Sequence, residues 1–143
     1  MRVYLDNSVL NRPFDNQSIS EIRLETTAAF SIFELIEKKK IKLVSSSVID
    51  YENSKNPFFD RKIWVSVYLS ESTLYQKLTL QIKERAKEFE KIGISPIDCL
   101  HLASAGAANV DYFLTCDYDI IRKYKGKLKV INPIDFIQLF KSK

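Results

Sequence analysis

Acidic residues stand where two segments typical of buried strands come to an end. Residues 3–5 run directly into Asp6, and residues 112–116 run directly into Asp117. Both segments are apolar and rich in β-branched and aromatic side chains, as strands buried on both faces are. In open α/β sheets, ligands bind at the carboxyl ends of the strands, so acids at these positions could hold a cation.

Two more acids fall near predicted helix starts. Glu52 lies in the first turns of the helix expected after the second strand, and Asp98 follows the helix-starting pair Ser95-Pro96. A helix that follows a strand begins at the edge where that strand ends, which brings Glu52 towards Asp6. Three helices precede that of Asp98, so this rule leaves its edge open.

Four carboxylates at one edge would need a counter-charge. Two unit charges about 4 Å apart repel by about 4 kcal/mol at an effective dielectric constant of about 20. Helix amino termini offset only about 0.3–1 kcal/mol each. Mg²⁺ or Mn²⁺ prefers oxygen ligands from carboxylates and water, and such an ion can activate water for attack on a phosphate. The four acids together therefore predict a divalent metal site.

Each acid also has a purely structural interpretation. Asp98 could complete a capping box, and Asp117 could cap the short helix that follows it. Asp6 could end its strand through a turn, and Glu52 could be a solvated helix residue. Asp50 competes with Glu52, because residues two apart on a helix face different ways and only one can point into the cluster. The occurrence of all four acids at element ends favours the metal site.

Hydrophobic periodicity and caps predict the elements that position these acids. Residues 7–17 are expected to form a loop, since Asn11, Pro13 and Asn16 interrupt them. Ser18 with Glu21 resembles a capping box that opens the first long helix. Asn56-Pro57 and Ser95-Pro96 are typical of a cap followed by proline at the first helical position, and Gly93 is typical of a helix end. The expected strands cover residues 2–6, 41–47, 112–116 and 128–132, and the expected helices cover 18–40, 48–55, 57–70, 73–92, 97–108, 119–124 and 133 onward.

This alternation predicts an α/β fold with three layers, α/β/α, around a central, mostly parallel sheet of four or five strands. The 143 residues suit a single domain over 1–143. The start shows no basic leader or long apolar run, and no segment approaches about 18 uninterrupted apolar residues, so we expect a cytoplasmic protein without a membrane span. The net charge of +4 weakly favours a polyanionic partner such as nucleic acid.

Four motifs carry a resemblance to a known family. They are YLDNSVLNRPFD at 4–15, VSSSVIDYENSKN at 44–56, SPIDCLHLASA at 95–105 and FLTCDYD at 113–119. In this order, over essentially the whole chain, they resemble the motifs of the PIN domain, a family of metal-dependent ribonucleases that includes many toxins of bacterial toxin–antitoxin pairs. The resemblance is to the VapC-like toxins among them.

The resemblance implies a role for each matched residue. The acids Asp6, Glu52, Asp98 and Asp117 would be catalytic and would hold one or two Mg²⁺ or Mn²⁺ ions, with Asp117 as a further or water-mediated ligand. The hydroxyls of Ser8 and Thr115 would orient water or a carboxylate. The substrate would be single-stranded RNA, a small antitoxin protein could be a partner, and a homodimer is expected.

Three further features remain open from the sequence. Arg12 and Lys55 lie in or near loops at the acid edge and are candidates for substrate phosphate contacts. His101, the single histidine, shares a helix face with Asp98, and we favour a residue that holds a neighbour over a metal ligand. A non-catalytic RNA- or protein-binding module on the same fold is the alternative function.

Overall fold

The computed structural model describes residues 1–141 and contains one five-stranded sheet. Its strand order is β3-β2-β1-β4-β5, and every pairing is parallel. The strands are β1 (Arg2–Leu5), β2 (Lys42–Ser46), β3 (Leu74–Gln76), β4 (Tyr112–Leu114) and β5 (Val130–Ile131). The central strand β1 is bracketed by β2 and β4, so the strand that precedes Asp6 lies in the middle of the sheet.

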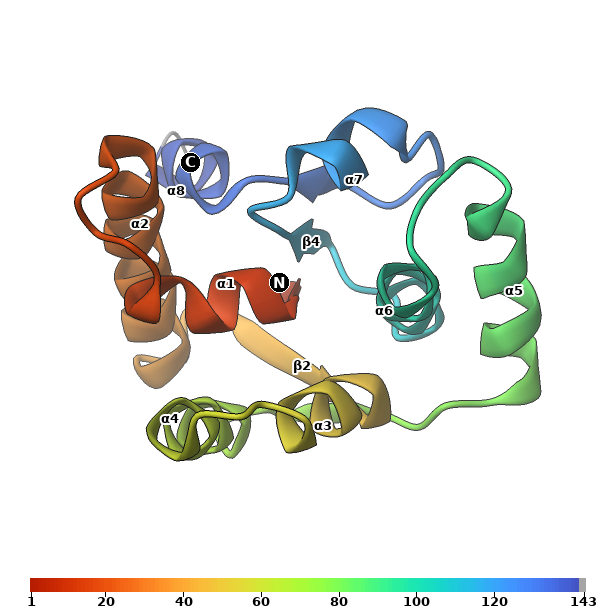
Figure 1. The fold of residues 1–143 in the computed structure, drawn as a ribbon, viewed down its shortest axis with the longest axis horizontal. Helices are drawn as coiled ribbons and strands as arrows, with labels where there is room; N and C mark the ends of the chain where they lie inside the picture. The colour runs from red at the N-terminus through yellow and green to blue at the C-terminus, as the bar shows by residue number, and fades with distance from the viewer. Residues whose placement is uncertain (142–143) are drawn as a thin grey trace.

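Helices cover both faces of this sheet. Figure 1 shows the strands between the pair α2 and α8 on one side and the pair α5 and α6 on the other, and each pair packs together. The helices are α1 (Asn7–Asn11), η1 (Arg12–Phe14, a 3₁₀ helix), α2 (Ser20–Glu37), α3 (Ser47–Ser54), α4 (Phe59–Leu69), α5 (Leu80–Glu90), α6 (Pro96–Ala107), α7 (Tyr118–Lys123) and α8 (Pro133–Lys141). The prediction of a three-layer α/β fold with a parallel sheet is confirmed.

The residues of the central strands explain why both faces must be covered. Val3, Tyr4, Leu5, Phe113 and Leu114 have no exposed surface at all. Successive side chains of a strand point to opposite faces of the sheet. Strands with apolar side chains at consecutive positions therefore need cover on both faces, and helices pack on both sides. The sheet thereby holds the carboxyl ends of β1, β2 and β4 rigidly side by side.

The region after β1 differs from the predicted loop. Residues 7–11 form α1, because Asp6 acts as its N-cap and accepts hydrogen bonds from the N–H groups of Ser8 and Val9. The predicted capping box was also wrong: α2 begins at Ser20 with Ile19 as its N-cap, and the Ser18 hydroxyl donates instead to Asn16. The polar residues that predicted a loop are therefore compatible with a short helix, because Asp6 caps its first turn.

The segment 73–92 was predicted as one helix and is wrong in its first part. Residues 74–76 form the edge strand β3, which pairs with β2, and Thr79 then caps α5 through the Ile82 N–H. A strand of three residues is too short to display a period of two, so the helical periodicity that follows concealed it. The start of α4 also moves to Phe59, because Asn56 accepts from the Phe58 N–H in a turn before the helix.

Other cap predictions are confirmed. Ser95 is the N-cap of α6, with Pro96 in the first turn of the helix. Gly93 has a φ of +89°, the left-handed conformation that glycine adopts without steric cost after a helix end. Among the described residues no helix is both long and apolar enough to span a bilayer.

Candidate functional site

Asp6 is the central acid of the candidate site. Its side chain is only 3% exposed, at the carboxyl end of the central strand. The Ser8 hydroxyl donates to Asp6 Oδ1 at 2.5 Å, and the N–H groups of Ser8 and Val9 donate to the same oxygen at 3.1 and 3.3 Å. The carboxylate is therefore fixed in one orientation by the start of α1.

Hydroxyl groups tie Asp6 to the end of β4. Ser8 Oγ also accepts from the Cys116 N–H at 2.9 Å, and Thr115 Oγ1 lies 3.4 Å from Ser8 Oγ. Thr115 Oγ1 in turn accepts from the Asp117 N–H at 3.0 Å. Ser8 and Thr115 thus lie between Asp6 and Asp117, which supports the orienting role that the family motifs imply.

The electrostatics of Asp6 are those of an acid without a counter-charge. Burial raises the pKa of Asp6 from 3.8 to about 6, against the lowering effects of the hydrogen bonds from Ser8 and Thr115 and of His101. The negative charge of Asp98 raises this pKa slightly further. In residues 1–141, no lysine or arginine forms an ion pair with Asp6. The ionised form of such a buried carboxylate is stabilised when a cation binds to it from solution.

Glu52 and Asp50, the two candidates for the second acid, have different partners. Glu52 Oε1 accepts from His101 Nε2 at 2.7 Å, and the histidine is fully buried in α6. Asp50 points away and accepts from the exposed Tyr75 hydroxyl at 2.7 Å. Glu52 is therefore the acid directed at the inner face of α6, and His101 holds it, as the sequence favoured.

Asp98 lies at the amino-terminal turn of α6 and belongs to the same edge. Its Oδ2 accepts from the Ser95 hydroxyl at 2.7 Å. Burial is the main cause that raises the pKa of Asp98, and the charges of Glu52 and Asp117 raise it further. The sequence held a signal for this position: α6 runs to the amino end of β4, so its start lies near the carboxyl edge.

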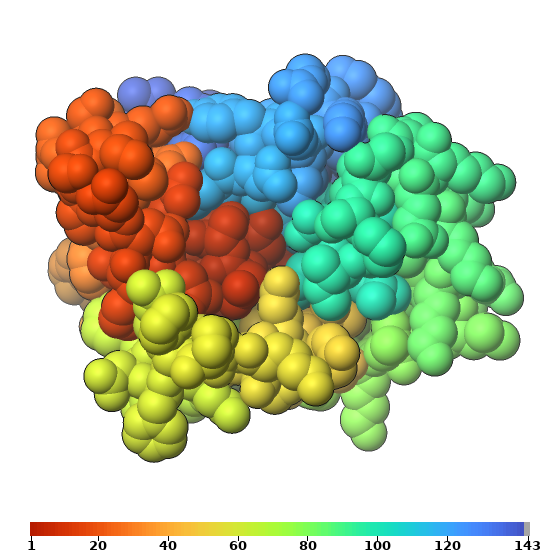
Figure 2. Space-filling model, in the orientation of Figure 1, coloured from red at the N-terminus to blue at the C-terminus, as the bar shows by residue number. Residues whose placement is uncertain are grey.

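Asp117 caps a helix, which is the structural role that the sequence left open, and it also lies at the acid edge. It is the N-cap of α7 and its Oδ1 accepts from the Asp119 N–H at 2.9 Å. Asp98, Asp117 and Asp119 line one small depression of about 160 Å³. Figure 2 shows α1 in red, α3 in yellow, the start of α6 in teal and the segment around α7 in blue meeting in the middle of one face.

The acids form an open edge. Within residues 1–141, no three acidic, histidine or cysteine side chains converge closely enough to form a preassembled metal cage. Mg²⁺ keeps several waters and is commonly held by one or two carboxylates, so an open edge suits it. The donor set of carboxylate oxygens, with the buried and uncompensated charge of Asp6 among them, fits a hard divalent cation.

The two candidate phosphate contacts have different surroundings. Lys55 lines a shallow depression of about 450 Å³ together with Glu52 and Ser8, and its ammonium group lies 5.5 Å from the Tyr51 ring centre. Arg12 instead donates two hydrogen bonds to Glu25 Oε1, at 2.7 and 3.0 Å, and one to Asp15. Most of the guanidinium is thus used inside the protein.

Sequence reasoning missed Glu25, which has no exposed surface. Besides Arg12, it accepts from the Asn132 side chain at the start of α8. Its spacing was a usable signal, because Glu25 lies three residues after Ile22 and four before Ala29 on the apolar face of the predicted helix. An acid on such a face indicates a buried ion pair.

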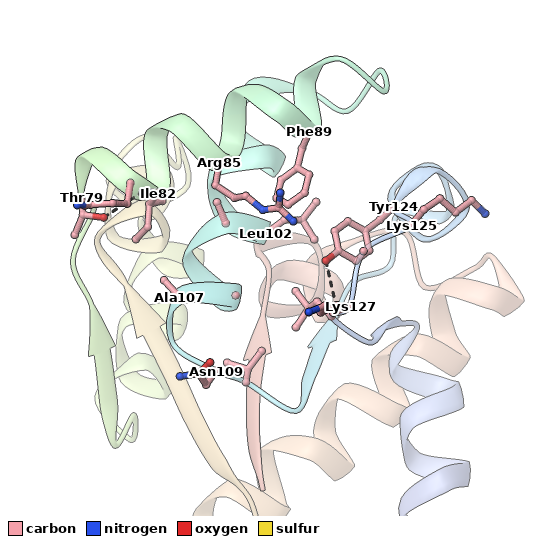
Figure 3. Close-up of a pocket in the computed structure, with 16 residues that line it drawn as sticks. Thr79, Ile82, Arg85, Phe89, Leu102, Ala107, Asn109, Tyr124, Lys125 and Lys127 are labelled. Carbon is pink, nitrogen blue, oxygen red and sulfur yellow. Dashed lines mark hydrogen bonds between the residues drawn. The ribbon is translucent and has the colours of Figure 1, made fainter.

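A cavity larger than these two depressions lies away from the acids. It measures about 780 Å³ and is lined by residues of α5, of the carboxyl-terminal part of α6 and of the segment 124–128. Figure 3 shows Phe89 and Tyr124 forming its wall, with Arg85 stacked over Phe89 at 4.8 Å. This cavity lies at the carboxyl-terminal end of α6, whereas Asp98 lies in the first turn of the same helix.

Comparison with known proteins identifies the family. The family model for the PIN domain matches residues 3–127, and the chain belongs to this family, as the motifs predicted. PIN domains are generally nucleases, and they generally use divalent metal ions.

Two solved structures share the fold. A structure of VapBC2 from Rickettsia felis, bound to a DNA fragment from their promoter, aligns with a TM-score of 0.63 at 19% identity over 92% of this chain and 98% of that chain. A structure of FitAcB from Neisseria gonorrhoeae aligns with a TM-score of 0.61 at 13% identity over 92% of this chain and 97% of that one. The search of curated proteins found no match.

Proposed function

We propose that the protein is an endoribonuclease that depends on Mg²⁺ or Mn²⁺ and hydrolyses phosphodiester bonds of single-stranded RNA. The observation that carries the proposal is Asp6, which is only 3% exposed and has no ion-pair partner among residues 1–141. Its pKa is raised to about 6, and three further acids lie at the same edge. Membership of a family that generally consists of metal-using nucleases supports it.

Each acid has a part in this proposal. Asp6, Glu52 and Asp98 would hold the ion, and Asp117 would add a ligand or orient a bound water. A divalent ion at this edge would supply a Lewis acid that polarises a phosphate oxygen and lowers the pKa of water. Ser8 and Thr115 keep Asp6 oriented, and the hydrogen bond from His101 leaves the second oxygen of Glu52 without a partner among residues 1–141.

The substrate contacts of the proposal centre on Lys55. Its depression also contains Arg61, whose guanidinium stacks on Phe58 at 4.3 Å, so two positive charges and one exposed ring line the same depression as Glu52. Backbone phosphates and unstacked bases of a single strand are recognised by such pairs of basic and aromatic groups. Arg12 would contribute through the field of its charge and by holding η1 against α2.

A protein partner forms the second part of the proposal. Helix α4 exposes Phe59, Ile63 and Val67 at successive intervals of four residues, with 72%, 49% and 58% of their surfaces accessible. A continuous apolar stripe of this kind on a small domain is typical of a protein interface. We propose a small antitoxin as partner, which the similarity to VapBC2 and FitAcB supports, and a homodimer as the functional assembly.

The test is cleavage of end-labelled single-stranded RNAs by the purified protein with Mn²⁺, Mg²⁺ or EDTA. DNA strands of the same sequences run in parallel to separate RNA from DNA cleavage. Asp6→Asn should lower the cleavage rate by about 100-fold or more, because loss of metal stabilisation amounts to several kcal/mol. Glu52→Gln should act in the same direction.

Asp50→Asn is the matched control. Like the two variants above it replaces a carboxylate with an amide, and it lies on α3 with Glu52, but its side chain contacts Tyr75 outside the acid edge. It should cleave at the wild-type rate. Equal rates for wild type and Asp6→Asn would refute metal-dependent catalysis at this site. Metal and RNA binding without any turnover would favour the non-catalytic binding module, which the open arrangement of the acids also allows.

A further inference from the structure

A chain of buried hydrogen bonds connects Glu52 with the interior of the sheet. His101 Nε2 lies 2.7 Å from Glu52 Oε1, and His101 Nδ1 lies 2.6 Å from the Tyr4 hydroxyl. The Tyr4 hydroxyl lies 2.7 Å from Ser46 Oγ, which accepts from the Ile49 N–H at 3.1 Å. Tyr4, Ser46 and His101 have no exposed surface.

The donors and acceptors of this chain permit one arrangement that satisfies every proton. An ionised carboxylate only accepts, so His101 Nε2 carries the proton that is donated to Glu52. Ser46 Oγ already accepts from a backbone N–H, so its hydroxyl proton goes to the Tyr4 oxygen. The Tyr4 proton then goes to His101 Nδ1, which makes the imidazole neutral with its proton on Nε2.

Rigid packing holds each member of the chain in place. Tyr4 stacks on Phe113 of the neighbouring strand with ring centres 5.3 Å apart, and the His101 ring meets the Tyr4 ring edge-on at 5.7 Å. Glu52, in contrast, has a flexible side chain that is 27% exposed. Without a fixed donor, its carboxylate would lose rotamer freedom whenever it bound a ligand.

We propose that Ser46, Tyr4 and His101 are positioning residues that hold the Glu52 carboxylate at the acid edge, with Oε1 occupied by His101 Nε2–H and Oε2 directed to the divalent cation. This inference rests on the proposed metal site and extends it to three residues that are not acids. Residues that hydrogen-bond to metal ligands commonly change metal affinity or activity by about 10- to 100-fold when they are replaced.

The first experiment reads the proton position directly. Because His101 is the single histidine, a long-range ¹H–¹⁵N spectrum of the uniformly labelled wild-type protein shows only one imidazole. At neutral pH, Nε2 should resonate as a protonated nitrogen and Nδ1 as an unprotonated one. A proton on Nδ1 would overturn the proposed chain, whether or not Nε2 is also protonated.

The second experiment measures metal affinity without RNA. Tyr4→Phe removes one oxygen from the chain and keeps the packed ring, so Mn²⁺ affinity measured by calorimetry or electron paramagnetic resonance should fall about 10-fold. The Mn²⁺ affinity of His101→Leu should fall at least as far. His101→Gln should retain most of the affinity, because its amide can still donate to Glu52.

Ser104→Ala is the matched control on the same helix. Ser104 is fully buried three residues after His101, and its hydroxyl has no hydrogen-bond partner in the described chain. This variant should bind Mn²⁺ like the wild type, and circular dichroism should show that all variants are folded. Failure of wild-type protein to bind Mn²⁺, or equal affinity of wild type and Tyr4→Phe, would overturn the positioning role.

The outcomes separate this inference from the proposed activity. Weaker Mn²⁺ binding in Tyr4→Phe, together with no RNA cleavage by the wild type, would support the positioning chain and refute the ribonuclease. RNA cleavage by the wild type with unchanged Mn²⁺ affinity in Tyr4→Phe would support the ribonuclease and refute the chain.

Discussion

Asp6 and Glu25 are two buried acids that the fold treats in opposite ways. Glu25 accepts two hydrogen bonds from the Arg12 guanidinium and a third from Asn132, so its charge is compensated within the protein. Within the described part of the chain, Asp6 receives hydrogen bonds from hydroxyl and N–H groups but forms no ion pair, and burial raises its pKa to about 6. Glu25 is therefore a buried acid paired within the protein, whereas burial disfavours the ionised form of Asp6.

We expect this difference to distinguish a buried acid with a structural role from one that binds a metal ion. Burial alone does not separate them, since 3% and 0% of their surfaces are exposed. The presence of a protein cation does separate them, because a permanent guanidinium leaves no electrostatic need for a metal ion. Four predictions test this contrast.

The largest expected effect is the loss of the Glu25 ion pair. Glu25→Gln should lower the free energy of unfolding by about 3 kcal/mol, because Arg12 keeps only Asp15 and the new amide faces the amide of Asn132. Urea denaturation followed by circular dichroism measures it. Glu21→Gln, one turn earlier on the same helix and exposed, is the control and should change stability by less than about 1 kcal/mol.

Divalent metal should stabilise the wild-type protein by a similar amount. At a free Mn²⁺ concentration 100 times the Kd, ligand binding to the folded state adds about 2.7 kcal/mol. Asp6→Asn should show little of this gain, whereas Glu25→Gln should keep it. Thermal unfolding with and without Mn²⁺ tests the contrast, and equal metal-induced shifts in all three proteins would contradict it.

Without metal, Asp6→Asn should stabilise the protein by about 2 kcal/mol near pH 7.5, since one unit of pKa corresponds to about 1.4 kcal/mol and a neutral amide accepts weaker hydrogen bonds. The pKa of Asp6 is higher in the folded protein, about 6, than its ordinary value of 3.8. Its stabilising contribution is therefore complete below about pH 3.8 and is lost as the pH rises through about 6.

The measurement is the free energy of unfolding in EDTA across this pH range. Wild type should lose stability between about pH 4 and 6 relative to Asp6→Asn, with a residual slope in both from Asp98, whose pKa is raised as well. Parallel curves for the two proteins would show that the pKa of Asp6 is not raised by folding.

The smallest effect is expected at Asp50. Asp50→Asn should change the free energy of unfolding by less than about 0.5 kcal/mol, because the residue is exposed and its amide oxygen can still accept from the Tyr75 hydroxyl. A loss above about 1 kcal/mol would show that this contact contributes more to the attachment of β3 than its exposure indicates.

Local sequence patterns were sufficient to predict the fold class and the candidate acids. Apolar segments that end on Asp6 and Asp117 indicated parallel strands and their carboxyl edge, because strands buried on both faces need an uninterrupted apolar pattern. Caps such as Ser95 and Gly93 could also be predicted, since they depend on a few neighbouring residues.

Tertiary structure alone decided the features that depend on residues distant in the chain. The choice of Glu52 over Asp50 required the contact with His101, which is 49 residues away, and the compensation of Glu25 required Arg12 and Asn132 from other elements. The short strand β3 exists because β2 offers an unpaired edge, which its three residues could not signal alone. Local patterns determine helices, strands and caps, whereas the partners of a buried charge are set by packing.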